Sequence, residues 1–157
     1  MELMDKLWNA AKENKQRIVL PEGDEERTIV ATEKIQKEGL AFPILIGDEE
    51  KILNKAKELD VDLTGVEIIN PNKSDRLQDY INEFYESRKN KGMTLEKADK
   101  IVRDPLYFGT MMVKVGDADG IVSGACHPTA HTLRPALQIL KTAPGTKLAS
   151  AFFLMVT

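Results

Sequence analysis

The chain has 157 residues, 42% of them hydrophobic, and a formal net charge of −3. This length and composition are typical of one globular domain with its own core, and the small negative charge argues against a broad surface for nucleic acid or anionic membranes. The single cysteine, Cys126, excludes an intrachain disulfide and predicts a reducing, cytoplasmic compartment.

The first residues predict an amphipathic helix followed by a strand. Apolar side chains recur at helical spacing along residues 1–14. Acidic and lysine side chains interrupt them, so this segment is neither a signal peptide nor a membrane span. A short apolar run at 17–21 ends in proline and predicts a buried strand.

Helical and strand patterns then alternate. Asp24 is predicted to cap a helix that runs to about Glu38 and ends at Gly39, and Ser74 to cap a long helix that runs to about Arg88. Further strands are expected at 41–46, 66–69, 120–124 and 147–155, and further helices at 48–59, from 94, at 105–115 and at 129–141. The alternation predicts an α/β fold with three layers, in which a mostly parallel sheet lies between helices.

The end of the chain predicts a longer polypeptide. The apolar run at 152–156 has the character of a central strand, yet nothing follows to cover it. An exposed strand of this kind invites edge pairing and aggregation. We therefore expect the natural polypeptide to continue beyond this segment.

Three loops are candidates for a ligand site, because open parallel sheets bind ligands outside the carboxyl ends of their strands. They are residues 22–27, 70–75 and 123–134. The third is the most informative. A helix predicted to begin near Thr129, just after Pro128, would offer free backbone N–H groups and the positive end of its dipole.

Polar side chains in the third loop suit an anion. Hydroxyls of Ser123, Thr129 and Thr132 are close in sequence, and Arg134 could form two parallel bonds to a phosphate or carboxylate. Together they predict an anion pocket. The alternative is that Thr129 only caps the helix and Arg134 pairs with an acid on a neighbouring element.

Two histidines and the cysteine in this loop have alternative interpretations. His127 and His131 could share one helical face as metal ligands, but Pro128 separates them and no third ligand is evident, so hydrogen bonding is favoured and no metal is expected. Cys126 beside His127 could be a nucleophile, although an inert thiol is the commoner case. The basic run at 88–92 fits a dipole-stabilised helix end or a patch for a distant phosphate.

The sequence resembles the phosphate acetyltransferases. The resemblance is carried by RIVLPEGDEERTI at 17–29 with EGLAFPILIG at 38–47, FYESRKNKG at 84–92, and SGACHPTAHTLRPALQILKTAPG at 123–145. It covers essentially the whole chain in order. Phosphate butyryltransferases and the C-terminal module of some malic enzymes are related families.

The resemblance implies an enzyme that interconverts acetyl-CoA plus phosphate with acetyl phosphate plus CoA. The CoA thiolate attacks directly, without an acetyl-enzyme, and CoA is a substrate rather than a permanently bound cofactor. Members are longer than this chain, fold as two α/β domains around one cleft, and form homodimers through the second domain. Residues 1–145 would then be most of the first domain, and 146–157 the first strand of the second.

The resemblance also implies roles for individual residues. Arg134 and Arg88 match arginines that bind CoA or phosphate groups, whereas the catalytic serine, the aspartate base and a further arginine lie in the part absent here. Members often carry aspartate where His131 stands and valine where Cys126 stands. The residues expected to bind substrate are Arg134, Arg88, Ser123, Gly124, Thr129, Thr132 and His127.

Two other functions remain open at this stage. One is a phosphate butyryltransferase, which differs only in its preferred acyl chain. The other is a non-catalytic module that senses acetyl-CoA, like the tail of malic enzymes. On either enzymatic reading, this chain alone is expected to be inactive.

Overall fold

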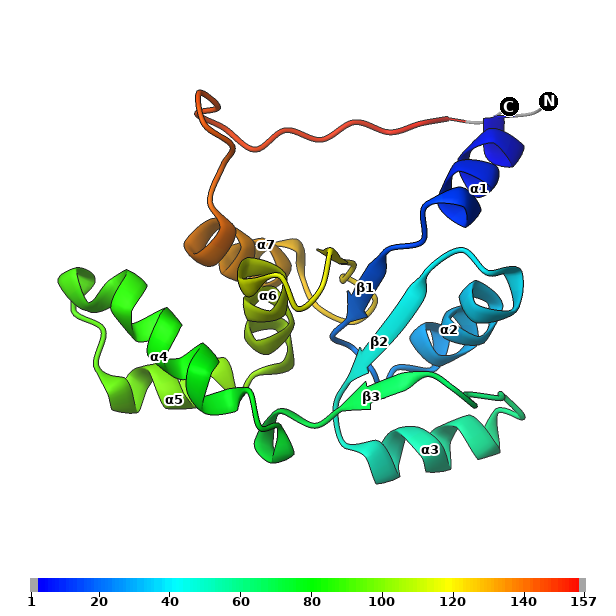
Figure 1. Ribbon diagram of the computed structural model, residues 1–157, viewed down its shortest axis with the longest axis horizontal. Coiled ribbons are helices and arrows are strands. Elements are labelled where there is room, and N and C mark those ends of the chain that lie inside the picture. The colour runs from blue at the N-terminus through cyan, green and yellow to red at the C-terminus, as the bar shows by residue number, and fades with distance from the viewer. Residues whose placement is uncertain (1–2, 156–157) are drawn as a thin grey trace.

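The computed structural model describes residues 3–155, and within them four parallel strands form one sheet with helices on both faces (Figure 1). This confirms the predicted α/β class. None of the helices in this range has the length and apolar character needed to cross a membrane. The strands are β1 (Arg17–Leu20), β2 (Phe42–Ile46), β3 (Glu67–Ile69) and β4 (Gly120–Ile121). The helices are α1 (Leu3–Glu13), α2 (Glu26–Glu38), α3 (Glu49–Glu58), α4 (Leu77–Arg88), α5 (Leu95–Val102), α6 (Pro105–Val115) and α7 (Thr129–Pro135), with short helical turns η1 (Pro71–Lys73), η2 (Lys89–Lys91) and η3 (Ala136–Leu140).

The strand order creates one switch point in the sheet. The order is β3-β2-β1-β4, so the chain moves outward from β1 to β3 and then crosses back to place β4 on the other side of β1. Val19 of β1 pairs with Ile121 of β4 and with Ile44 of β2. The loops that follow β1 and β4 therefore lie next to each other at the carboxyl edge, where such sheets bind ligands.

Alternating side chains build a core on each face of the sheet. Val19 and Ile44 face α4, α5 and α6, whereas Leu20 and Leu45 face α2 and α3. Figure 1 shows these two helix groups on opposite sides of the strands. All four side chains are buried, which contributes about 1.5–3 kcal/mol each to folding. Because helices cover both faces of the sheet, side chains that point to either face are apolar from Ile18 to Leu20 in β1 and from Phe42 to Ile46 in β2.

Two predicted helix starts are wrong in detail. Glu25, not Asp24, caps α2, because its carboxylate accepts the Thr28 backbone N–H at 3.0 Å. Ser74 does not cap α4: its hydroxyl accepts the Arg76 N–H at 3.2 Å in a turn, and the helix begins only at Leu77. The end of α2 is as predicted, with Gly39 in the left-handed region at φ 65°.

The segment after β4 also differs from the prediction. The strand stops at Ile121 rather than Gly124, since the following amides turn toward the loop after β1. The helix predicted at 129–141 divides into α7 and the π-helical turn η3. Pro135 stands at the division and has no N–H to donate, so it removes one bond of the regular ladder.

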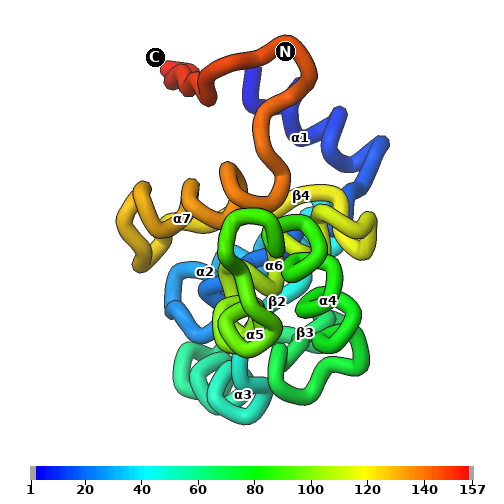
Figure 2. Tube along the Cα trace, turned by 90° about the vertical axis from the view of Figure 1, so that its left-hand side faces the viewer, coloured from blue at the N-terminus to red at the C-terminus, as the bar shows by residue number. Residues whose placement is uncertain are grey.

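The strand predicted at 147–155 is not formed among the described residues. This segment is extended and exposed, with Phe152 at 88% and Phe153 at 92% of full accessibility. Figures 1 and 2 show it and α1 projecting from the same side of the body. A strand needs a neighbouring ladder to satisfy its amides, and within residues 3–155 this segment has none.

Gly109 on α6 allows that helix to lie directly on β1. A β-carbon at this position would lie 2.7 Å from Val19 Cγ1. We expect Gly109→Ala to lower the free energy of unfolding by about 1–3 kcal/mol, because overpacking outweighs the gain in helix propensity. Chemical denaturation measures the change. Lys114→Ala, at an exposed position of the same helix, is the control, and a Gly109→Ala variant as stable as this control would contradict the tight packing.

Candidate functional site

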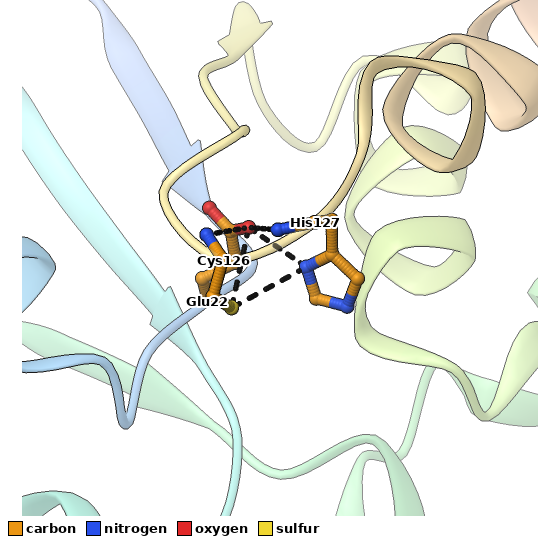
Figure 3. Close-up of side chains that lie close together, drawn as sticks. All are labelled: Glu22, Cys126 and His127. Carbon is orange, nitrogen blue, oxygen red and sulfur yellow. Dashed lines mark hydrogen bonds and ion pairs between the residues drawn. The ribbon is translucent and has the colours of Figure 1, made fainter.

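Two loops meet at the switch point around the buried carboxylate of Glu22 (Figure 3). Its Oε2 accepts the backbone N–H groups of Gly124 at 2.9 Å and Ala125 at 2.8 Å. Its Oε1 accepts those of Cys126 at 2.9 Å and His127 at 3.0 Å. Four successive amides of the loop after β4 thus converge on one side chain from the loop after β1.

The hydrogen bonds keep Glu22 ionised. Burial raises the pKa of this carboxyl, but the Cys126 amide, the His127 ring and the Ala125 and Gly124 amides together lower the pKa from its usual 4.5 to about 2. Charge-assisted bonds from several N–H groups have this effect because they favour the charged form. Glu22 is therefore a hydrogen-bond acceptor throughout the physiological range.

The imidazole of His127 is oriented by the same carboxylate. Its Nδ1 lies 2.7 Å from Glu22 Oε1. An ionised carboxylate can only accept, so Nδ1 carries the proton of this bond. The other ring nitrogen, Nε2, lies on the side of the ring away from Glu22, toward α6 (Figure 3).

Cys126 has the environment of an inert thiol rather than of a nucleophile. Its Sγ lies 3.4 Å from Glu22 Oε1 and 3.5 Å from His127 Nδ1. Burial and the hydrogen bond to Glu22 raise the pKa of the thiol, which disfavours the reactive thiolate.

The same three residues offer oxygen, nitrogen and sulfur within 4.8 Å, a spacing that could hold a metal ion. However, each oxygen of Glu22 already accepts two backbone N–H bonds. A metal would have to displace some of them. The arrangement of Glu22, Cys126 and His127 therefore favours a hydrogen-bonded anchor for the loop over a metal centre.

Arg27 joins the two loops a second time. Its guanidinium donates to the Ala125 carbonyl oxygen and, through Nε, to Glu25 Oε1 at 2.6 Å. Glu25 is in turn the cap of α2. The loop after β4 is thus tied through Arg27 to the first turn of a packed helix, which limits its freedom to move.

A pocket of about 220 Å³ lies beside this anchor. Tyr107 of α6 lies in its wall, and burial raises the pKa of the phenol while the positive charges of Arg134 and Arg88 lower it. Of these two arginines, Arg134 is the one that lines the pocket. The pocket is lined by Asp104, Leu106, Tyr107, His127, His131 and Arg134.

Several residues predicted to bind substrate have unused hydrogen-bonding capacity. Arg88 Nε, Ser123 Oγ and Thr132 Oγ1 are buried and have no hydrogen-bond partner among the described residues. Buried polar atoms are nearly always paired, so these three atoms, two of them from the loop at 123–134, need an explanation. A bound polar ligand would supply partners for them.

The simpler alternatives for Thr129 and Arg134 find no support in the geometry. Pro128 holds the cap position of α7, and no side chain caps that helix. Within the described residues, Arg134 forms no ion pair with an acid. Arg134 is free to meet a ligand in the pocket that it lines.

The second predicted loop, 70–75, does not join the other two. It follows β3, at the opposite edge of the sheet from β4. Asn72 in this loop instead accepts a bond from Arg103 at 2.8 Å. The site therefore forms from the loops at 22–27 and 123–134.

Sequence reasoning missed the central role of Glu22. The local signal was the glycine that follows it. A β-carbon on Gly23 would lie 2.6 Å from the Ile46 carbonyl oxygen, so the tight turn that aims Glu22 requires glycine. Its partners lie more than a hundred positions away, at Gly124 to His127, where no local pattern indicates them.

Comparison with known proteins places this geometry in one family. The family model described as phosphate acetyl/butaryl transferase matches residues 2–157. Phosphate acetyltransferases from Clostridium acetobutylicum and Thermoanaerobacterium thermosaccharolyticum are 54% and 52% identical, and each alignment covers 99% of this chain but 47% of the relative. The solved EutD phosphotransacetylase from Staphylococcus aureus is similar at a TM-score of 0.86 and 41% identity, over 94% of this chain and 46% of that one. The chain thus spans about half the length of the relatives it matches.

The charge of Glu22 should make folding stability depend on pH. A lowered pKa in the folded protein gives stability that is complete above about pH 4.5 and is lost as pH falls toward 2. At about 1.4 kcal/mol per pKa unit, the loss approaches about 3 kcal/mol. Denaturation at pH 6, 4 and 2.5 in the wild type and Glu22→Gln measures it.

We expect the wild type to lose more stability across this range than Glu22→Gln, which has no carboxyl to protonate. Glu33→Gln is the matched control, because Glu33 pairs with Lys37 at the surface, where solvent weakens the interaction. Equal pH slopes in the wild type and Glu22→Gln would show that Glu22 does not anchor the loop by its charge.

Proposed function

The chain belongs to the phosphate acetyl/butaryl transferase family, and we propose that it forms the first half of a phosphate acetyltransferase. The enzyme would interconvert acetyl-CoA plus phosphate with acetyl phosphate plus CoA. Residues 1–145 would form most of its first domain, and 146–157 would begin the second. The observation that carries the proposal is the pocket lined by Arg134, His127 and Tyr107, beside the anchored loop at the switch point.

The residues of the pocket suit this chemistry. Both directions of the reaction involve a phosphate dianion and the phosphates of CoA, and arginine binds such oxygens with paired N–H donors. We propose that Arg134 and Arg88 bind these groups. Ser123, Gly124, Thr129 and Thr132 are not among the residues that line the pocket. We propose that they contact the same ligand from the adjoining loop and the start of α7, since Ser123 Oγ and Thr132 Oγ1 are buried without partners among the described residues.

The remaining half of the enzyme would supply the reacting groups. A general base would deprotonate the CoA thiol, and donors would stabilise charge on the acetyl carbonyl oxygen. The thiolate of CoA would attack directly, and CoA would be a substrate with no permanently bound cofactor. We further propose that the complete protein is a cytoplasmic homodimer. The relatives are named acetyltransferases, which favours acetyl over butyryl transfer.

The proposal predicts that activity depends on the second half. We expect phosphate-dependent thiol release from acetyl-CoA in a chimera that joins residues 1–157 to the remaining part of the Clostridium acetobutylicum relative. The chain alone should release no thiol above background. Activity in the chain alone would mean that the base lies within these residues. A folded but inactive chimera would reject the transferase function.

Arg134 should act in substrate binding rather than in stability. In the chimera, we expect Arg134→Ala to lower kcat/KM by about 10-fold to 100-fold, the size of a lost charge-assisted hydrogen bond. The melting temperature should change little, because Arg134 is exposed. Arg103→Ala is the control, since Arg103 bonds to Asp99 and Asn72 and none of the three lines the pocket. Proportional losses of activity and stability in Arg134→Ala would make Arg134 structural.

A further inference from the structure

His127 is expected from the sequence to bind substrate, and its pairing with Glu22 is a feature that the binding roles proposed above do not use. The imidazole Nδ1 is held at 2.7 Å by a buried carboxylate that is itself fixed by four backbone N–H groups. The edge of the ring that carries Nδ1 is therefore fixed against Glu22, and the edge that carries Nε2 is directed away from it (Figure 3). His127 lines that pocket together with Arg134 and Tyr107.

We infer that Glu22 is a positioning residue that fixes the tautomer and orientation of His127, so that Nε2 contacts a phosphoryl oxygen of the substrate. This inference rests on the proposed function. Glu22 itself touches no substrate, because its oxygens are occupied by the loop amides and the imidazole. It acts by deciding which ring nitrogen is presented.

The tautomer follows from the charges around the ring. A neutral imidazole has one donor and one acceptor nitrogen, and a carboxylate that can only accept selects Nδ1 as the donor. Nε2 is then an acceptor for the O–H of a hydrogenphosphate, and it becomes a donor to an ionised phosphoryl oxygen when the ring is protonated. A phosphate group has both kinds of oxygen, so it can pair with Nε2 in either state of the ring.

The neighbouring charges favour the same ligand. The pocket wall contains Arg134, and the charge of Arg88 also reaches Tyr107 in that wall. A second histidine, His131, lines the pocket as well. Asp104 is the one carboxylate among the lining residues. Its Oδ1 accepts the backbone N–H groups of Leu106 and Tyr107 at 2.9 and 3.4 Å, so part of its charge is directed into the start of α6.

Ring-nitrogen spectra test the positioning role without any need for activity. The chain has two histidines, so ¹⁵N-histidine labelling gives few signals, and His131 serves as an internal reference. We expect Nδ1 of His127 to carry the proton when the ring is neutral. In Glu22→Gln this preference should be lost, because an amide can donate as well as accept. Glu33→Gln, on α2 and paired with Lys37 outside this network, should leave the His127 signals unchanged.

The kinetic arm tests the contact with substrate in the chimera. We expect His127→Gln to raise one KM about 10-fold, as for one lost hydrogen bond to a charged group, with a much smaller change in kcat. A higher KM for inorganic phosphate would assign the contact to that ion, and a higher KM for CoA would assign it to the CoA phosphates. Glu22→Gln should raise the same KM. In the double variant, the fold-increase in this KM should be smaller than the product of the two single fold-increases, because the two residues act through one contact.

Distinct results would overturn the inference. A proton on Nε2 of neutral His127 in the wild type, or an unchanged tautomer in Glu22→Gln, would show that Glu22 does not set the ring. Unchanged KM values for both substrates in an active His127→Gln chimera would remove the phosphoryl contact. An inactive wild-type chimera would reject the proposed function and the contact with it, while the spectra would still decide the role of Glu22.

Discussion

The buried charge of Glu22 is the constraint on which the site depends. An ionised carboxylate away from water is tolerated only when donors surround it. Here the donors are four successive amides, Gly124 to His127, and one imidazole. The loop after β4 must take one shape to supply them, because losing any of these bonds leaves part of the charge unpaired. The same bonds that make the charge tolerable therefore define the loop.

The sheet topology places Glu22 and the loop that it anchors at the carboxyl edge, where ligands bind to such sheets. β4 lies beside β1 only because the chain crosses back over α4, α5 and α6. That crossing brings the loops at the ends of β1 and β4 together at the carboxyl edge. The close fit of Gly109 against Val19 and of Gly23 against the Ile46 carbonyl sets how near these elements approach. A small error in either packing would move Glu22 away from its amides.

The sequence predicts what local patterns encode and misses what depends on distant contacts. The α/β class follows from alternating apolar periods, and the end of α2 from Gly39. The predicted cap at Asp24 and the predicted end of β4 at Gly124 were wrong, because the cap at Glu25 and the early end of β4 both depend on where a side chain points in the folded loop. The role of Glu22 could not be predicted for the same reason. An acid before a glycine in a turn is common, and its partners here are amides about a hundred residues away in the sequence. The strand predicted at 147–155 was not formed for a different reason. Its sequence pattern is strand-like, but among residues 3–155 no neighbouring strand pairs with it.

The site therefore combines a rigid part with groups that are not yet satisfied. The rigid part is the loop fixed by Glu22 and Arg27, which positions the His127 ring. The unsatisfied groups include Arg88 Nε and Ser123 Oγ, which are buried without partners in the described chain. Preorganised donors gain affinity because they lose little freedom when a ligand arrives. Arg134 forms no ion pair with an acid among the described residues and lines the same pocket as the oriented imidazole, an arrangement suited to phosphate oxygens. The carboxylate that orients the ring lies on the opposite side of the ring from Nε2 (Figure 3).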